Sequence, residues 1–503
     1  MLKWIAAVGI SALAVTAGAE ISPAESSAAL NAPADAGPGV TSVRVSGPTP
    51  FSRCPALPLD QELPAGAVQP VVAVNPRDPA NIVAVWQQDH DHGIVAGVSF
   101  DAGRSWRQVV IPGMTGCTGG SYEYGDDVWA SFGADGVLHA SVHVGDVVNG
   151  RQGASSRLYT RSTDGGLTWS TPVSVVPYLP PSEGVYGPGS IAADPSDPRL
   201  VYSLVPTFAE PGVTQSTAFR GTVVLTSSTD GGRSWEPARV IYDTGPGRLT
   251  TADHLVVLPN HELVDVFTLI TDPQRGQMSV AAIRSTDDGQ TWSAPVIAAT
   301  LGPAQVTDPQ TGVRINNYSA GTTAAAVDPR TGRVYVAWED SRWGGGTVNA
   351  IALSSSNDAG QSWTAPVKAN ATPASLPPLD QQSFIPSVSV TANGDVGVAY
   401  YDLRATDRSV LLADRWLDVC RHAGNSACTT FSTEVRLTPN SFNLENAPVS
   451  SAGTGIKGYF LGEYEGLATT PGGFIAVFEQ PAGSDPAQIF ATTVRGETSA
   501  RAW

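Results

Sequence analysis

The segment Ser228-Thr229-Asp230-Gly231-Gly232-Arg233-Ser234-Trp235 is one copy of a pattern that the chain contains five times. The shared pattern is S-x-D-x-G-x-[ST]-W, and successive aspartates lie 57 to 71 residues apart. A unit that recurs at this spacing indicates a repeat architecture, in which each unit packs on its neighbours. The five copies contain Asp101 and Trp106, Asp164 and Trp169, Asp230 and Trp235, Asp287 and Trp292, and Asp358 and Trp363.

Each copy has the composition of a tight turn between two strands. The aspartate can accept hydrogen bonds from backbone N–H groups ahead of it, and glycine supplies the positive φ that a hairpin needs. The Ser or Thr before the tryptophan begins the next strand, and the tryptophan offers a large apolar surface to a neighbouring unit. Because a reaction needs one site and not five, we interpret these residues as structural.

The composition favours many short strands in one large array. Charged residues make up 15% of the 503 residues, whereas the chain has 52 glycines and 39 prolines, a mixture typical of strands joined by tight turns. The formal net charge of −17 argues against nucleic acid and anionic membrane surfaces as partners. It does not exclude a small anionic substrate, because a local arginine cluster can oppose the global field.

The N-terminal segment has the features of a signal peptide. Lys3 supplies the positive start, residues 5–15 the apolar run, and Ala17-Gly18-Ala19 a small-residue cleavage site. We therefore expect a signal peptide at residues 1–19, a flexible leader at 20–50 with a β-like run at 40–45, and one domain at 51–503. The apolar run is too short to span a bilayer easily, and no other stretch is long enough. The sequence predicts a secreted or periplasmic protein.

The four cysteines fit an oxidising compartment, because their number is even. Cys420 and Cys428 flank a short polar loop, so they are the first predicted disulfide. Cys54 and Cys117 would then form the second. The spacing of the cysteines matches no zinc-binding pattern.

A pair of apolar runs joined by a turn rich in Gly, Pro, Asn and Asp occurs seven times. These pairs lie at 71–86, 129–142, 190–204, 255–269, 324–338, 388–401 and 466–478. Seven units of this kind, each a four-stranded antiparallel meander, predict an all-β fold, a β-propeller. The sixth and seventh units lack the repeated pattern, and the seventh ends before a fourth strand. The run at 40–45 can supply that strand and close the ring. We expect seven blades, with six as the alternative.

The repeated pattern resembles the Asp box of the sialidase (neuraminidase, BNR-repeat) superfamily of β-propellers, and the resemblance covers nearly the whole mature chain. Members of that superfamily include glycoside hydrolases, polysaccharide lyases and non-enzymatic receptor propellers. The resemblance implies that the boxes lie on peripheral hairpins, on the face opposite the active site. Functional residues should then lie in the loops between second and third strands and in those between blades.

Those loops are rich in acids, arginines and aromatic residues, which suit a polyhydroxylated or acidic sugar. The resemblance implies three arginines for a substrate carboxylate, and a tyrosine nucleophile with a glutamate and an aspartate. The Arg-Ile-Pro motif that carries the first arginine is absent here. The predicted catalytic residues are Tyr464, Glu463, Glu465, Asp340 and Asp402. The predicted substrate-binding residues are Arg342, Arg404, Arg314, Tyr401, Trp343, Asp253 and His254.

Several of these residues have a structural alternative. Asp340 with Arg342, and Asp402 with Arg404, can face a substrate or can join neighbouring loops as ion pairs. Asp253-His254 can be an acid–base pair or a structural histidine. Asp89-His90-Asp91-His92 can bind a metal or form a solvated loop. No cofactor is expected, although Asp126-Asp127 and other loop acids can hold a structural Ca²⁺.

The leading function from sequence is a secreted propeller that acts on glycans, as an exo-acting glycoside hydrolase similar to an exo-α-sialidase. The alternatives are a non-catalytic propeller that binds glycan or protein, and a polysaccharide lyase. The sequence does not determine the sugar, the linkage or the oligomeric state.

Overall fold

The computed structural model describes residues 40–59, 64–180, 184–209, 220–272, 276–315, 321–407, 409–421, 427–451 and 457–495. The predicted signal peptide and the leader up to residue 39 lie outside these ranges. Within them the structure is all-β, and the only helical elements are short 3-10 turns, namely η2 (Gly116–Thr118), η3 (Pro378–Gln381) and η4 (Leu444–Asn446). No helix of this described part is long and apolar enough to cross a membrane.

The described ranges contain seven antiparallel sheets in which four strands are hydrogen-bonded side by side, from a first (inner) to a fourth (outer) strand. The first strands are β2 (Ala67–Val74), β6 (Tyr124–Phe132), β11 (Ser190–Ala193), β15 (Leu249–Val257), β20 (Thr323–Val327), β24 (Ser383–Val390) and β31 (Gly466–Thr470). The second strands are β3 (Ile82–Gln88), β7 (Leu138–Val148), β12 (Val201–Ala209), β16 (Leu263–Asp272), β21 (Val334–Gly344), β25 (Val396–Asp402) and β32 (Gly473–Ala482).

The outer half of each sheet completes the meander. The third strands are β4 (Gly93–Ser99), β8 (Arg151–Ser162), β13 (Arg220–Ser228), β17 (Gln277–Ser285), β22 (Val348–Ser356), β26 (Leu412–Cys420) and β33 (Asp485–Arg495). The fourth strands are β5 (Arg107–Val110), β9 (Val173–Leu179), β14 (Arg239–Pro246), β18 (Val296–Leu301), β23 (Val367–Lys368), β27 (Thr433–Arg436) and β1 (Val40–Arg44).

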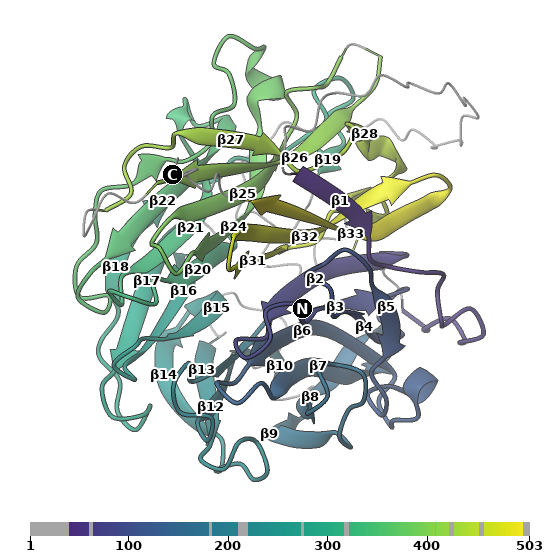
Figure 1. The fold of residues 1–503 in the computed structure, drawn as a ribbon, viewed down its shortest axis with the longest axis vertical. Coiled ribbons are helices and arrows are strands. Elements are labelled where there is room, and N and C mark those ends of the chain that lie inside the picture. The colour runs from purple at the N-terminus through teal and green to yellow at the C-terminus, as the bar shows by residue number, and fades with distance from the viewer. Residues whose placement is uncertain are drawn as a thin grey trace, which may run out of the picture.

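The sheets form a closed ring (Figure 1). The first strands contact one another in the order β2, β6, β11, β15, β20, β24 and β31, and β31 contacts β2 again. β1, from the N-terminal side, pairs antiparallel with β33 as the outer strand of the last sheet. The propeller class and the closing N-terminal strand are therefore as predicted, and this contact order supports seven blades over six.

Several two-residue strands lie outside the four-stranded meanders. β10 (Val185–Tyr186) pairs with β12, and β28 (Phe442–Asn443) pairs with β26. A small sheet joins β19 (Arg314–Ile315), β29 (Val449–Ser450) and β30 (Gly458–Tyr459). This small sheet contains Arg314, one of the predicted binding residues.

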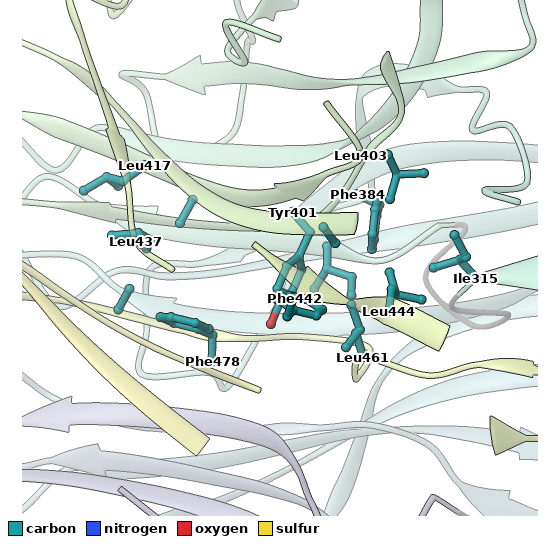
Figure 2. Close-up of a cluster of buried hydrophobic side chains, with 14 of the residues drawn as sticks. Ile315, Phe384, Tyr401, Leu403, Leu417, Leu437, Phe442, Leu444, Leu461 and Phe478 are labelled. Carbon is teal, nitrogen blue, oxygen red and sulfur yellow. The ribbon is translucent and has the colours of Figure 1, made fainter. Parts of the chain in front are cut away.

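The hydrophobic core lies between adjacent blades, because each sheet buries both faces against its neighbours. Figure 2 shows the cluster between the sixth and seventh blades, which contains Phe384 and Tyr401 of one blade and Phe478 of the next. Comparable buried clusters lie between the other neighbouring blades. Burial of aliphatic and aromatic side chains at every blade interface is the main favourable contribution to this fold.

The Asp boxes form the hairpins between third and fourth strands in the first five blades. In the third blade, Asp230 Oδ1 accepts hydrogen bonds from Ser228 Oγ (2.9 Å) and Ser234 N (2.9 Å), and Oδ2 accepts from Ser234 Oγ (2.6 Å). These bonds, led by that from the Ser234 hydroxyl, lower the pKa of Asp230 to about 2. The carboxylate is thus committed to the turn, which agrees with a structural role.

Each box tryptophan packs against the preceding blade. Trp235 lies with Tyr159 and Val176 of the second blade, and its ring meets that of Tyr159 edge-on, 4.7 Å between centroids. Trp106, Trp169, Trp292 and Trp363 occupy the corresponding clusters. The repeated pattern therefore both closes a hairpin and joins two blades.

The two predicted disulfides are present, Cys54–Cys117 and Cys420–Cys428. The first joins the segment after β1 to η2, and the second closes a loop between β26 and β27.

Candidate functional site

A cavity of about 30 Å³ lies where the first strands begin. The register places this end of each blade opposite the Asp boxes: Ala67 of β2 pairs with Gln88, whereas the other end of the same sheet contains Ser99, the first residue of an Asp box. Residues from five blades line the cavity, and those with chemical potential are Asp127, Trp129, Asp253, His254, Glu463 and Tyr464.

A β-bulge orients the side chains that β6 and β15 present to the cavity. The register shifts between Asp126 and Trp129 of β6, where Asp127 has φ 45°, and between Thr251 and His254 of β15, where Ala252 has φ 54°. An extra residue in one strand bends it and re-aims the neighbouring side chains. Both bulges lie at the same place in their blades, so the ring brings their side chains toward one axis.

The third contribution comes from the segment that precedes β31. Glu463 and Tyr464 follow Gly462, which has φ 75°, and both line the cavity. The sequence placed Glu463-Tyr464-Glu465 at the start of the inner strand of the last blade, but β31 begins only at Gly466. The structure nevertheless brings four predicted residues, Asp253, His254, Glu463 and Tyr464, to one place.

Burial raises the pKa of the cavity carboxyl groups. Burial, and then repulsion from Asp127 and Asp126, raise the pKa of Glu463 to about 8. Burial and repulsion from Asp126 raise the pKa of Asp127 to about 7. Burial, followed by repulsion from Asp265, also raises the pKa of Asp253. Near neutral pH these carboxyl groups are therefore partly or wholly protonated, so they can donate protons as well as accept them.

The aromatic side chains form one wall. The ring of Trp129 meets His254 edge-on at 5.1 Å and Tyr464 at 5.4 Å between centroids. Burial lowers the pKa of His254 to about 4, so the imidazole is neutral near pH 7. Burial, then the negative charges of Asp127 and Glu463, raise the pKa of Tyr464. Its hydroxyl has no hydrogen-bond partner among the described residues.

Glu465 and Tyr401 lie away from the cavity. Tyr401 is fully buried, and its hydroxyl donates to Glu465 Oε1 at 2.9 Å and to the carbonyl of Glu479 at 2.6 Å. Burial raises the pKa of Glu465 to about 8. Tyr401 lies in the buried cluster between the sixth and seventh blades (Figure 2), and Glu465 is its hydrogen-bond partner there.

Asp340 and Arg342 pair with each other at the end of β21. Arg342 Nη2 lies 2.6 Å from Asp340 Oδ2 and also donates to the carbonyl of Thr300 at 2.9 Å. Its guanidinium stands 5.5 Å from the ring centroid of Trp343, which is 40% exposed. These contacts join the β21–β22 loop to the preceding blade, as the structural alternative expected.

Asp402 and Arg404 form a second local network. Arg404 Nε lies 2.5 Å from Asp402 Oδ2, and Nη2 lies 2.7 Å from Glu434. The guanidinium also stacks on Trp416, 3.9 Å from its centroid. Burial raises the pKa of Asp402 to about 6, although Arg404 opposes this shift. None of Arg314, Arg342 and Arg404 lines the axial cavity.

Three residues near the axis were not selected from the sequence as site residues: Trp129, His143 and Arg157. Asp126 and Asp127 were noted only as acids for calcium. Asp126 pairs across the sheet with His143, and His143 pairs with Arg157 on the next strand. This row crosses three strands, so only the register relates its members. Aligning the predicted second and third strands of the meander with the first would have indicated that these residues lie in one row.

The fold and the Asp boxes together define a sialidase-like β-propeller. Residues 124–398 match the family described as BNR repeat-like domain, and the chain belongs to this family. A search of curated proteins finds no significant match to the chain.

Several solved structures are similar in fold. A protein of unknown function from Dyadobacter fermentans has 12% identity and a TM-score of 0.45, over 91% of this chain and 100% of its own. A Hadza microbial sialidase has 14% identity and a TM-score of 0.46, over 82% and 73%. The α-L-arabinanase of Penicillium chrysogenum, solved with arabinobiose, has 15% identity and a TM-score of 0.41, over 73% and 92%.

Proposed function

We propose that the chain is an exo-acting glycoside hydrolase whose reaction takes place at the axial cavity. The observation that carries this proposal is that one aromatic wall and three acidic residues, Asp127, Asp253 and Glu463, line the same cavity. Aromatic rings stack on sugar faces, and carboxyl groups bond sugar hydroxyls and transfer protons. Hydrolysis of a glycosidic bond by paired carboxyl groups needs this combination.

The size of the cavity supports an arrangement in which the sugar lies across its mouth. A volume of about 30 Å³ has room for about two water molecules, which is less than a sugar ring occupies. A hydroxyl group or the glycosidic oxygen can enter it. Because the first strands surround the axis, a glycan chain reaches the cavity most easily by its end, which favours exo action.

Glu463 is the proposed general acid. Its raised pKa, about 8, keeps a proton on the carboxyl group near neutral pH, and a protonated carboxyl group can donate to the leaving oxygen. Asp127 is the proposed partner carboxylate, since it loses its proton first of the two. Its negative charge would stabilise the positive charge that develops on the sugar ring.

Tyr464 is the residue that the sialidase-like version of this function uses as nucleophile. Tyr464 lines the cavity with Glu463, and its hydroxyl has no hydrogen-bond partner among the described residues, which supports a role in the reaction. The three arginines predicted to bind a substrate carboxylate lie in other contacts. Because none of these arginines lines the cavity, an uncharged sugar is favoured over a sialoside.

We also propose that the protein works outside the reducing cytoplasm. The two disulfides support this proposal, because such bonds persist in extracellular and periplasmic compartments.

A substrate panel tests the function. The protein is incubated with fluorogenic glycosides of neutral sugars, a fluorogenic sialoside and uronate-containing polysaccharides, and both fluorescence and the absorbance of unsaturated products are followed. We expect hydrolysis of a neutral glycoside, which Glu463→Gln reduces by roughly 10²–10⁴-fold. Glu262→Gln, on the Asp-box side, is the control. Absorbance without fluorescence would identify a lyase, and glycan binding without turnover would identify a non-catalytic propeller.

A further inference from the structure

The side chains of Asp126, Asp127 and His143 form a compact set of metal-binding donors beside the axial cavity. One ligand atom from each lies within 4.8 Å of the others. Cation–oxygen bonds of about 2.4 Å place opposite ligands about this far apart. Asp126 and His143 are register partners on β6 and β7, with Nδ1 and Oδ1 2.5 Å apart. The bulge at Asp127 turns the third donor toward them.

A second observation points to a ligand at this place. Asp91 is only 3% exposed, and its Oδ1 has no hydrogen-bond partner among the described residues. Its carbonyl accepts from Gly125 N at 2.9 Å, which fixes it beside β6, and its carboxyl group experiences repulsion from both Asp126 and Asp127. A buried carboxyl oxygen without a partner, close to two other acidic groups, is costly unless a ligand compensates it.

Two further buried polar atoms at this place have no hydrogen-bond partner among the described residues. They are Nε2 of His143 and the hydroxyl of Tyr124, and the two rings meet edge-on at 5.8 Å between centroids. We propose that Asp126, Asp127 and His143, with Asp91 beside them, bind one divalent cation next to the axial cavity.

The donor set indicates the class of cation. Carboxylates suit Mg²⁺, Ca²⁺ and Mn²⁺, whereas an imidazole nitrogen suits transition metals. Mn²⁺ accepts both, so two carboxylates with one histidine fit Mn²⁺ better than Ca²⁺ or Zn²⁺. A bound dication would also relieve the mutual repulsion of the three carboxyl groups.

Cation binding can be measured without any substrate, so this proposal does not depend on the hydrolase function. Chelator-treated protein is titrated calorimetrically with MnCl₂, ZnCl₂ and CaCl₂, and bound Mn²⁺ is counted by electron paramagnetic resonance. We expect about one Mn²⁺ per folded chain. Asp126→Asn, Asp127→Asn and His143→Gln should each weaken binding by at least about tenfold. Asp243→Asn, which changes an exposed ion pair with Arg220, should bind as the parent does.

The titrations give distinct outcomes. The proposal is overturned if none of the three cations binds saturably, or if Asp127→Asn and Asp243→Asn bind with equal affinity. Ca²⁺ binding that His143→Gln leaves unchanged would overturn the transition-metal assignment. Circular dichroism shows whether each variant folds. If the two β6–β7 variants Asp126→Asn and His143→Gln do not fold, Asp127→Asn and Asp91→Asn decide the result.

Discussion

The guanidinium of the buried Arg157 holds the main chain of Asp127, because Nη2 donates to its carbonyl oxygen at 3.1 Å. Nη2 also donates to the carbonyl of Gly189 at 2.8 Å, and Nε donates to Ser141 Oγ at 2.7 Å. In the sixth blade, Arg415 has the same position. It donates to the carbonyl of Ile385, which is the left-handed residue of the bulge in β24. Each arginine therefore satisfies a carbonyl that its bulge withdraws from the sheet.

We expect Arg157→Met to destabilise the protein and to impair the site. The substitution leaves buried carbonyl and hydroxyl groups without a donor, which lowers the free energy of unfolding by about 2–4 kcal/mol. Arg415→Met should cost a similar amount, but only the change at 157 should release Asp127 and reduce turnover of the folded enzyme. Urea unfolding and activity measured per folded molecule check this. Equal losses of turnover in both variants would contradict it.

The hydrolysis rate should fall as the pH rises above about 8. Glu463 must carry a proton to act as general acid, and its pKa of about 8 sets the upper limb of the profile. The measurement is kcat/KM of the chelator-treated protein between pH 5 and 10 on the glycoside that the panel identifies. Glu463→Gln should retain a low rate without this limb. A parent profile that is flat up to pH 10 would exclude Glu463 from the role.

Buried acid pairs should make the fold less stable at alkaline pH. Burial raises the pKa of Asp265 and of Glu465 to about 8, and that of their partners Asp253 and Glu479 also lies above its usual range. The folded state then binds more protons than the unfolded state between about pH 4 and 8. This contribution to stability is complete below pH 4 and is lost as the pH rises toward 8. We therefore expect Tm to decrease from pH 5 to pH 9, as measured by calorimetry.

The variant Asp265→Asn separates this effect from general alkaline unfolding. Its Tm should match that of the parent at pH 5 and exceed it at pH 9 by roughly 1–3 °C, because the neutral amide removes the repulsion with Asp253. Asp197→Asn is the control, since Arg199 lowers the pKa of Asp197 to about 2. A parallel shift of both variants at pH 9 would show that Asp265 does not cause the slope.

Loss of a box tryptophan should affect stability and not catalysis. Trp235→Ala removes a ring that packs on Tyr159 and Val176 of the second blade, which we expect to cost about 2–4 kcal/mol. Turnover of the folded variant should equal that of the parent, because the hairpin lies on the face opposite the cavity. Chemical unfolding and the activity panel measure the two quantities, and a change in kcat would argue against the assignment of the faces.

The fold was predictable because its information is local. Each Asp box contains its own acceptor, glycine and tryptophan within eight residues, so five copies define both the hairpins and the blade spacing. The closing strand followed from the missing fourth strand of the last unit. The cysteine pairs followed from the short loop between Cys420 and Cys428, which left Cys54 and Cys117 as the second pair. Glu463, Tyr464, Asp253 and His254 were found because topology alone assigns their loops to one face.

The details of the site depend on side-chain contacts between residues that are distant in the sequence or have several possible partners. Arg342 and Arg404 each follow an aspartate by two residues, and only the structure shows that each arginine forms an ion pair with that aspartate. Tyr401 points into the blade interface because the register of β25 directs it there, and Glu465 accepts its hydrogen bond. Asp126, His143 and Arg157 come from three strands, and Asp91 comes from another blade, so their proximity follows from strand pairing and blade packing together.

The pairing of β1 with β33 has a consequence for how the chain acquires its structure. Val40 lies opposite Val494, so the two halves of the last sheet come from opposite ends of the described chain. Such a contact forms slowly, because bringing together two segments so far apart in the sequence costs loop-closure entropy. During synthesis the blades can assemble in order, but the circle stays incomplete until the final strand emerges. Closure of the ring is therefore the last step of folding, because β33, one of its two partner strands, is the last described strand to be synthesised.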